Sequence, residues 1–339
     1  MQNYDIINKN MIVEVIMDKI NLEKFNEYSE IIKNIKNEVS KVVIGKKEAI
    51  DILIIGLLSS GHILVEDVPG LGKTTLALSL SKASGLLGRR MQFTPDVVAS
   101  DITGFSIYNK AKNDFEYREG IVLCNILLAD EINRTSPKTQ AALLEAMEEG
   151  MVTVDGQIHK IPQPFMVIAT QNPFGFVGTF PLPEAQLDRF MMKISMGYPT
   201  KAEEIDIISQ RKNSNPLDNV KPCTTSDVLI KIKEFVSDIH IDNNINEYIV
   251  DLVKATRDNE KIALGASPRA SLALMRVSQA KAFLEGRDYV IPEDISFMYP
   301  YIIKHRIVLK QEARLNKITI DDVLEEIIAS VKIPFTGKK

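Results

Sequence analysis

A glycine-rich turn that ends in Lys73 and Thr74 is the part of the sequence best suited to chemistry. It follows the apolar residues 63–65, which indicate a strand, and precedes residues 76–82, which indicate a helix. In that context glycines let backbone N–H groups close around phosphate oxygens, the lysine reaches the β- and γ-phosphates, and the hydroxyl can bind Mg²⁺. The segment therefore predicts a nucleotide site formed by Asp67, Val68, Pro69, Gly70, Leu71, Gly72, Lys73, Thr74 and Thr75.

One position departs from the usual phosphate-loop pattern. The pattern G-x-x-x-x-G-K-[ST] begins with glycine, and Asp67 stands there instead. A side chain at this point could crowd the loop, although it removes neither the lysine nor the hydroxyl. Taken alone, the segment could also be a glycine turn before a core helix, so the rest of the sequence must decide.

An apolar run at residues 126–129 ends in two carboxylates, Asp130 and Glu131. Asp130 suits a Mg²⁺ ion bound directly or through water, and Glu131 could orient and deprotonate an attacking water molecule. Without the upstream phosphate loop, the two acids would more simply be the solvated tip of a buried strand. With the loop present, the pair predicts a catalytic centre.

The apolar residues 166–170 indicate a third strand, which ends in Gln171-Asn172-Pro173. An amide at this strand end could donate a hydrogen bond to the γ-phosphate or to the attacking water. Asn172 could equally form the turn before a proline, which is a common arrangement. The position therefore supports the nucleotide site only together with the other two strand ends.

Short apolar runs alternate with helical segments over residues 41–199, and these strands and helices could position the residues named above. This alternation predicts an α/β fold with a mostly parallel sheet, whose strands carry functional groups at their carboxyl ends. Residues 137–149 indicate a long helix that ends at Gly150. Residues 151–161 alternate around an Asp-Gly pair and predict a hairpin, and residues 94–117 look irregular or hairpin-like.

The flanking segments predict helices. Residues 1–40 are amphipathic and form an N-terminal extension, with packing against the core as its first expected role and partner binding as its second. Thr200 and Glu203 fit a capping box ahead of a helix over residues 201–212. The α/β core is therefore expected to span residues 41–199, and an all-helical domain residues 200–339.

Composition excludes several classes of protein. The chain of 339 residues has 41 Lys and Arg against 45 Asp and Glu, a net charge of −4, so charge does not favour nucleic acid as the main partner. Two cysteines and four separate histidines form no disulfide framework or zinc pattern. No signal peptide and no apolar stretch long enough to span a bilayer is visible, so we expect a cytoplasmic protein without a membrane span.

With three strand ends in place, the sequence resembles AAA+ ATPases, and specifically the MoxR family. The resemblance rests on long strings that occur in the expected order over residues 63–270: Glu66-Asp-Val-Pro-Gly-Leu-Gly-Lys-Thr74, Gln92-Phe-Thr-Pro-Asp96, Ser100-Asp-Ile-Thr-Gly104, Asn125-Ile-Leu-Leu-Ala-Asp-Glu-Ile-Asn-Arg134, Thr139-Gln-Ala-Ala-Leu-Leu-Glu-Ala-Met147, Ala169-Thr-Gln-Asn-Pro173, Phe180-Pro-Leu-Pro-Glu-Ala-Gln-Leu-Asp-Arg-Phe190 and Gly265-Ala-Ser-Pro-Arg-Ala270. Glu-Asp-Val-Pro-Gly is similar to a common form of this family's phosphate loop, which makes the departure at Asp67 less important.

The resemblance implies roles for three polar residues and one glycine. Asn172 matches sensor 1, and Arg189 matches the arginine finger that reaches the γ-phosphate of a neighbouring subunit. A guanidinium supplied in this way stabilises the charge of the transition state. Arg269 matches sensor 2, which follows an expected N-cap serine and a proline at the first helical position. Gly45 would lie near the adenine, next to Lys46 where the family usually has glutamine.

The resemblance also assigns the two irregular segments. Residues 94–117 correspond to the helix-2 insert, and the hairpin at residues 150–162 corresponds to the pre-sensor-1 insert. Family members place both toward the central pore or the substrate. Four aromatic residues could contact a substrate there, or could pack within the insert: Phe93, Phe105, Tyr108 and Phe115.

The function implied is that of an ATP-driven, Mg²⁺-dependent motor that assembles or activates partner proteins. A finger acting in trans implies a homo-oligomer, expected to be a hexameric ring that binds ATP and releases ADP. Partners in this family are often von Willebrand factor A-domain proteins. A nucleotide-dependent switch with little hydrolysis and an ATPase subunit like that of magnesium chelatase stay open as alternatives. A DNA-dependent motor is disfavoured by the acidic composition.

Overall fold

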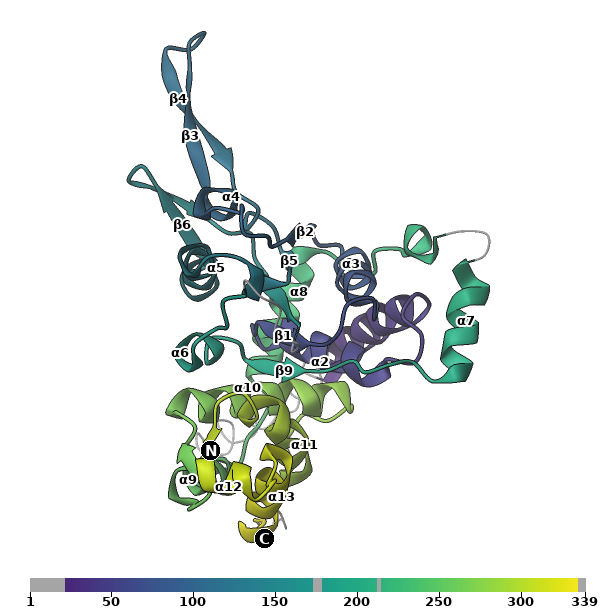
Figure 1. Ribbon diagram of the computed structural model, residues 1–339. Helices are drawn as coiled ribbons and strands as arrows, with labels where there is room; N and C mark the ends of the chain where they lie inside the picture. The colour runs from purple at the N-terminus through teal and green to yellow at the C-terminus, as the bar shows by residue number, and fades with distance from the viewer. Residues whose placement is uncertain (1–21, 173–178, 212–214, 335–339) are drawn as a thin grey trace, which may run out of the picture.

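A parallel sheet forms the centre of the fold in the computed structural model, which describes residues 22–172, 179–211 and 215–334 (Figure 1). In these residues the sheet has five strands in the order β2-β5-β8-β1-β9, and each neighbouring pair is parallel. The strands are β2 (Gly88–Gln92), β5 (Ile126–Asp130), β8 (Met166–Gln171), β1 (Ile63–Glu66) and β9 (Met192–Ile194). The expected α/β fold with a mostly parallel sheet is confirmed.

The three inner strands are apolar because both of their faces are covered. Alternate side chains of β1, β5 and β8 enter two buried clusters, one on each face of the sheet. One cluster includes side chains from α2 (Lys47–Leu58) and α3 (Lys73–Ala83), and the other includes side chains from α5 (Pro137–Glu149). Each inner strand therefore ends where its backbone leaves the core, and its last residue is only partly buried.

Two hairpins project from the same end of the core (Figure 1). The first joins β3 (Gly104–Asn109) to β4 (Asp114–Glu119) after the short helix α4 (Ala99–Thr103), and the second joins β6 (Met151–Val154) to β7 (Gln157–Lys160). The second turns at Asp155-Gly156, where both residues have positive φ angles as a two-residue hairpin loop requires. Tyr117 stacks on His159 with 3.6 Å between ring centroids, which joins the two hairpins.

Of the four aromatic residues named for this region, Phe93 does not belong to a substrate-facing surface. Its side chain is fully buried in the cluster on the α5 face of the sheet, because residue 93 directly follows β2 and its backbone N–H donates to the Asp130 carbonyl. The other three side chains are exposed, and Phe115 is the most exposed at 68%. Tyr108 and Phe115 pack edge to face across the first hairpin.

Beyond residue 200 the described chain is mainly helical, as expected. The helices are α7 (Lys201–Arg211), η2 (Pro216–Asn219), α8 (Ser226–Ser237), α9 (Asn243–Asp258), α10 (Pro268–Leu284), α11 (Pro292–Ile303), α12 (Gln311–Leu315) and α13 (Ile320–Ser330). The sequence did not indicate the small antiparallel pair β10 (Ile262–Leu264) and β11 (Val308–Leu309). Among the described helices, none combines the length and the apolar character that a bilayer crossing needs.

The described part of the N-terminal extension is a helix over residues 22–40. Its apolar face is buried through Ile32, Ile35 and Val39. Phe25 packs edge to face on Phe283 of α10, with 5.2 Å between ring centroids. The helix therefore packs against the helices that follow residue 225, while residues 1–21 of the expected extension lie outside the described residues.

A buried histidine joins β1, β8 and α5. The Nδ1 atom of His62 accepts a hydrogen bond from the Val167 N–H at 2.9 Å, and its Nε2 atom lies 3.0 Å from the Met147 carbonyl oxygen, to which it donates. Burial lowers the pKa of His62 from its ordinary value of 6.5 to about 4. The imidazole is therefore neutral in the folded protein at neutral pH.

This pKa predicts a loss of stability in acid. Between about pH 6.5 and 4 the unfolded chain binds a proton at residue 62 that the folded chain does not, so stability is complete above this window and falls as pH decreases through it. We expect His62 to contribute a slope of about 1.4 kcal/mol per pH unit there. Urea denaturation of the wild type and His62→Gln at several pH values measures this slope, because glutamine keeps a donor and an acceptor but does not titrate. An equal dependence on pH in both proteins would contradict the prediction.

Candidate nucleotide-binding site

The phosphate loop connects the end of β1 to the first turn of α3. Gly70 and Gly72 have φ angles of +90° and +86°, a region that costs other residues strain. A Cβ atom at either position would meet nothing within 4 Å, so the requirement for glycine is conformational rather than spatial. Gly72 directly precedes α3, whose free N–H groups and helix dipole favour an anion at this point.

Asp67, where the usual pattern has glycine, is used to anchor the loop. The Ser195 hydroxyl donates to its Oδ1 at 2.7 Å, and the Met196 backbone N–H donates to its Oδ2. Both partners directly follow β9, the edge strand next to β1. The side chain that could have crowded the loop therefore fastens its first residue to the neighbouring strand.

Lys73 is a partly buried cation held close to the loop. Its Nζ atom donates to the Asp67 carbonyl oxygen at 2.9 Å. Burial lowers the pKa of the Lys73 ammonium, and the nearby carboxylates of Asp130, Asp67 and Glu131 oppose this effect. An anionic group in the cavity would further stabilise the charged lysine, which is the role expected for it.

Asp130 at the end of β5 is held by two neighbours. Thr170 of β8 donates its hydroxyl hydrogen to Oδ1 at 2.6 Å, and Arg90 of β2 donates to Oδ2 at 2.8 Å. β5 lies between β2 and β8, so each adjacent strand supplies one contact. The carboxylate is therefore already oriented in the absence of a metal ion.

Glu131 has a left-handed backbone conformation, with φ at +56° and ψ at +50°. This conformation costs a non-glycine residue about 1–2 kcal/mol. It is supported by a hydrogen bond of 2.8 Å from the Glu131 N–H to the Thr170 hydroxyl oxygen. The carboxylate accepts hydrogen bonds at Oε2 from Gln92 at 2.9 Å and Arg134 at 2.8 Å.

These strand ends surround a cavity of about 390 Å³. Its polar wall contains most of the predicted site residues: Asp67, Pro69, Gly70, Leu71, Gly72, Lys73, Thr74, Thr75, Asp130, Glu131 and Asn172. The lining also includes the apolar residues Val42, Val43, Ile44, Pro199 and Ile207. A lining with both charged and apolar residues suits a nucleotide, whose phosphates and base need these two environments.

The donor set of the polar wall also fits Mg²⁺. In nucleotide sites this ion is commonly bound by one or two protein oxygens together with phosphate oxygens. The Thr74 hydroxyl and the Asp130 carboxylate would supply the protein oxygens. Both residues line the same cavity as Lys73.

Four of the predicted site residues do not line the cavity: Gly45, Val68, Arg189 and Arg269. Gly45 has a φ angle of +74°, and a Cβ atom there would overlap the carboxylate of Glu203. Its lack of a side chain therefore lets the capping box at the start of α7 approach residues 42–46. Thr200 and Glu203 form this capping box as expected.

Arg189 and Arg269 both pair with Glu148 of α5, at 2.8 Å each. Arg189 also donates to the Leu144 carbonyl oxygen at 2.9 Å. Both guanidinium groups are partly exposed. One carboxylate thus holds both arginines outside the cavity.

Ser267 occupies the expected N-cap position of α10, and Pro268 is the first helical residue. The Ser267 hydroxyl makes no capping hydrogen bond. It donates instead to Asp188 Oδ2 at 3.2 Å. The predicted N-cap position is therefore confirmed, but the hydroxyl donates to a distant carboxylate and does not accept from a local backbone N–H.

Four residues at or near the site carry no sequence signal strong enough to predict their role: Arg90, Gln92, Thr170 and Glu148. Arg90 and Gln92 belong to β2, a polar edge strand that lacks the apolar run of an inner strand. Thr170 could have been noticed as a hydroxyl one strand away from Asp130. Glu148 is one of three glutamates on α5, and the sequence does not distinguish it from the others.

Two parts of the chain match family models. Residues 62–192 match the ATPase family associated with various cellular activities (AAA), and residues 254–327 match the AAA lid domain. The first match contains the phosphate loop, Asp130, Glu131 and Asn172, and the second contains Arg269. The catalytic and lid elements expected from the sequence therefore occur within recognised modules.

The chain is also similar to individual proteins over most of its length. It is 48% identical over 296 residues to the uncharacterized protein YeaC of Bacillus subtilis, covering 87% of this chain and 92% of that protein. It is 39% identical over 306 residues to the chaperone MoxR1 of Mycobacterium tuberculosis, covering 88% and 81%. A crystal structure of a candidate ATPase from Cytophaga hutchinsonii matches with a TM-score of 0.85 and 41% identity, over 92% of this chain and 98% of that one.

Thr170 provides a test of how the two acidic residues are positioned. Thr170→Val removes the donor to Asp130 and the acceptor for the Glu131 N–H, which leaves a strained residue less supported. We expect ATP turnover to fall about 10-fold or more while ATP binding stays close to the wild-type value. Steady-state kinetics and nucleotide titration measure the two quantities, and Thr170→Ser is the control that keeps the hydroxyl. Equal turnover in the valine and serine variants would show that the hydroxyl has no positioning role.

Proposed function

The chain belongs to the MoxR family of AAA ATPases, and on this basis we propose that it hydrolyses ATP in the cavity described above, with Mg²⁺ as cofactor. The observation that supports this most directly is the meeting of three strand ends around one space. The phosphate loop after β1, the two carboxylates after β5 and Asn172 after β8 all line that cavity. A protein that only bound nucleotide would not need the second and third of these groups.

Each group has a role that follows from its position. The loop and the start of α3 bind the phosphates, and Lys73 neutralises the charge of the β- and γ-phosphates. Mg²⁺, when bound through Thr74 and Asp130, would neutralise charge that develops on the phosphate oxygens. Glu131 orients and deprotonates the attacking water, and Asn172 donates a hydrogen bond to that water or to the γ-phosphate.

We further propose that the site is completed by a second subunit. Arg189 and Arg269 lie together on Glu148 and do not line their own subunit's cavity. In Figure 1, α6 (Glu184–Leu187), which immediately precedes Asp188 and Arg189, lies on the opposite side of the core from α7 at the cavity. A head-to-tail arrangement of subunits would therefore bring the arginine pair of one subunit to the phosphates of the next.

Head-to-tail contacts form a ring when the rotation between subunits closes, and we propose that here they close into a hexamer. Arg189 would act as the arginine finger, and Arg269 would act beside it as sensor 2. Because each subunit would contribute to its own site and to that of its neighbour, hydrolysis in one subunit would depend on contact with the next.

The proposed use of the hydrolysis energy is the remodelling or activation of partner proteins. The two projecting hairpins expose apolar side chains, including Phe105, Ile107, Phe115 and Ile158, that suit contact with a protein. MoxR1, a relative of this chain, is named a chaperone. A von Willebrand factor A-domain protein in the cytoplasm is the partner that the family resemblance favours.

Completion of the site in trans predicts a dependence on protein concentration. We expect specific ATPase activity to rise with concentration in the wild type and to be abolished by Glu131→Gln. Arg189→Ala should lower turnover about 10³-fold or more, since an arginine finger contributes that much. Both variants should still bind ATP, because Lys73 and the phosphate loop are intact. Arg314→Ala is the matched control, since this arginine is exposed on α12.

Two results would contradict the proposal in different ways. Activity that is independent of concentration and unaffected by Arg189→Ala would exclude completion by a neighbour. ATP binding without turnover in the wild type, at concentrations where the ring is formed and a partner protein is present, would favour a nucleotide-dependent switch.

A further inference from the structure

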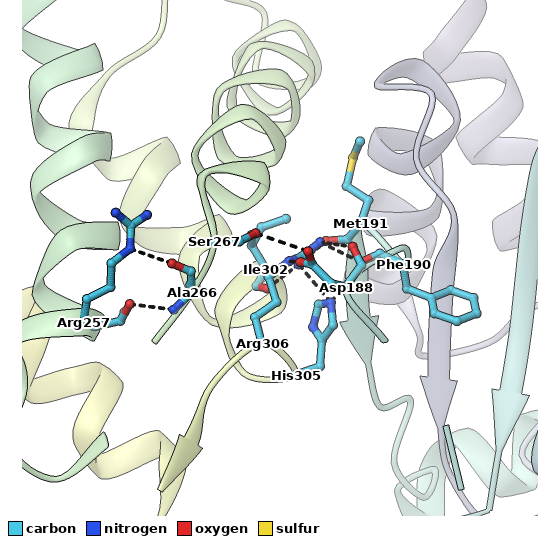
Figure 2. A network of polar contacts seen from close by, with 10 residues as sticks. Asp188, Phe190, Met191, Arg257, Ala266, Ser267, Ile302, His305 and Arg306 are labelled. Carbon is cyan, nitrogen blue, oxygen red and sulfur yellow. Dashed lines mark hydrogen bonds and ion pairs between the residues drawn. The ribbon is translucent and has the colours of Figure 1, made fainter. Parts of the chain in front are cut away.

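A buried arginine contacts the segment that carries the proposed finger, Arg189. Arg306 follows α11, and only 2% of its side chain is exposed. Its Nε atom donates to Asp188 Oδ1 at 2.6 Å, and Nη2 donates to the Phe190 carbonyl oxygen at 2.8 Å (Figure 2). Its Nη1 atom donates to the Met191 carbonyl oxygen at 3.0 Å.

The residues that Arg306 contacts flank Arg189 in the sequence. Asp188 precedes the finger, and Phe190 and Met191 follow it. Arg306 also donates to the Asp188 carbonyl oxygen at 3.2 Å, so a single guanidinium binds the backbone on both sides of Arg189. The planar group with five fixed donors restricts the position of this segment more than a flexible ammonium could.

The same cluster reaches the start of the helix that carries Arg269. The second carboxylate oxygen of Asp188 accepts the hydrogen bond from Ser267, two residues before Arg269. The preceding residue, Ala266, is held through its carbonyl oxygen by Arg257 Nε at 2.8 Å (Figure 2). Asp188 and Arg306 therefore connect the finger segment, the start of α10 and the end of α11.

The ion pair between Arg306 and Asp188 lies in a buried environment that disfavours charged groups. Burial lowers the pKa of the Arg306 guanidinium, and Asp188 opposes that effect. Burial holds the pKa of the adjacent His305 well below its ordinary value, so this imidazole is neutral and adds no second positive charge beside the guanidinium. A buried ion pair is weak evidence for stability, because apolar residues of similar volume often do as well. Stability alone therefore does not explain this ion pair, whereas a role in positioning the finger segment explains why Arg306 contacts that segment.

We propose that Arg306 and Asp188 are positioning residues that hold the segments carrying Arg189 and Arg269, so that both side chains can reach the neighbouring subunit's ATP. This inference rests on the proposed function. The C-terminal helices thereby set the geometry of the finger, and a movement of these helices relative to the core moves the finger with it. Neither residue touches the nucleotide itself.

Arg306→Lys is the first test, because lysine keeps the charge but cannot make the same set of hydrogen bonds. We expect turnover to fall about 100-fold, the effect that a displacement of 1 Å can have on a catalytic group. ATP binding and ring formation should stay close to the wild type. Arg287→Lys is the matched control, since Arg287 makes a bidentate pair with the buried Asp294 inside the C-terminal helices and does not contact the finger segment.

Mixed rings separate a positional role from a general structural defect. A Glu131→Gln subunit cannot hydrolyse its own ATP but presents an intact finger. In rings that contain Arg306→Lys and Glu131→Gln subunits, purified through two different tags, an Arg306→Lys site next to a Glu131→Gln finger should be active. Random mixing should restore about one quarter of the wild-type rate, as it should for Arg189→Ala mixed with Glu131→Gln.

Asp188→Asn is the second variant, in case the lysine variant fails to fold. It keeps the size of the side chain but removes the charge that holds Arg306, and we expect the same restoration in mixed rings. The inference is overturned if a folded variant turns over as fast as Arg287→Lys, or if its defect persists in mixed rings where Arg189→Ala is restored. If Arg189→Ala itself has wild-type activity, the proposed function fails first.

Discussion

Parallel pairing of β1, β5 and β8 is the constraint on which the rest of the site depends. Because the three strands run in one direction and end together, the phosphate loop, the two carboxylates and Asn172 meet at one edge of the sheet. Thr170 joins two of these strands directly, since its hydroxyl donates to Asp130 and accepts from the Glu131 N–H. The apolar clusters on both faces hold the strands in register. Their packing offsets the conformational free energy that the left-handed backbone of Glu131 costs.

The site is built with its groups divided between two places. Lys73, Asp130 and Glu131 surround the cavity, whereas Arg189 and Arg269 share Glu148 elsewhere on the same subunit. In the proposed account, one subunit binds nucleotide with Lys73 but lacks, in its own cavity, the two arginines that would further stabilise the transition state. The proposed coupling of hydrolysis to assembly rests on that division, and the buried cluster of Asp188 and Arg306 would extend this coupling to the C-terminal helices. In the proposed ring, hydrolysis would then respond to movements of α11, which is linked to the finger segment through Arg306 and does not itself contribute a residue to the cavity.

Sequence patterns predicted the centre of the fold and missed its edges, for a physical reason. Inner strands of a parallel sheet are covered on both faces and are therefore apolar runs, which made β1, β5 and β8 visible. The edge strands β2 and β9 are short or polar, so they carry no such signal. The Asp155-Gly156 turn was predicted because its φ angles demand those residue types. Long-range contacts such as Ser267 with Asp188 have no local pattern, and neither does the choice of Glu148 as the shared partner of two arginines.

The central claim is that one subunit completes the ATP site of the next. A structure of the Glu131→Gln protein assembled with ATP and Mg²⁺ tests it most directly, because this variant binds the nucleotide without consuming it. The account predicts a closed ring in which Arg189 has left Glu148 and contacts the γ-phosphate bound by the adjacent subunit, with Arg269 beside it. A structure in which ATP is bound while Arg189 and Arg269 stay on Glu148, with no neighbouring subunit at the γ-phosphate, would contradict it.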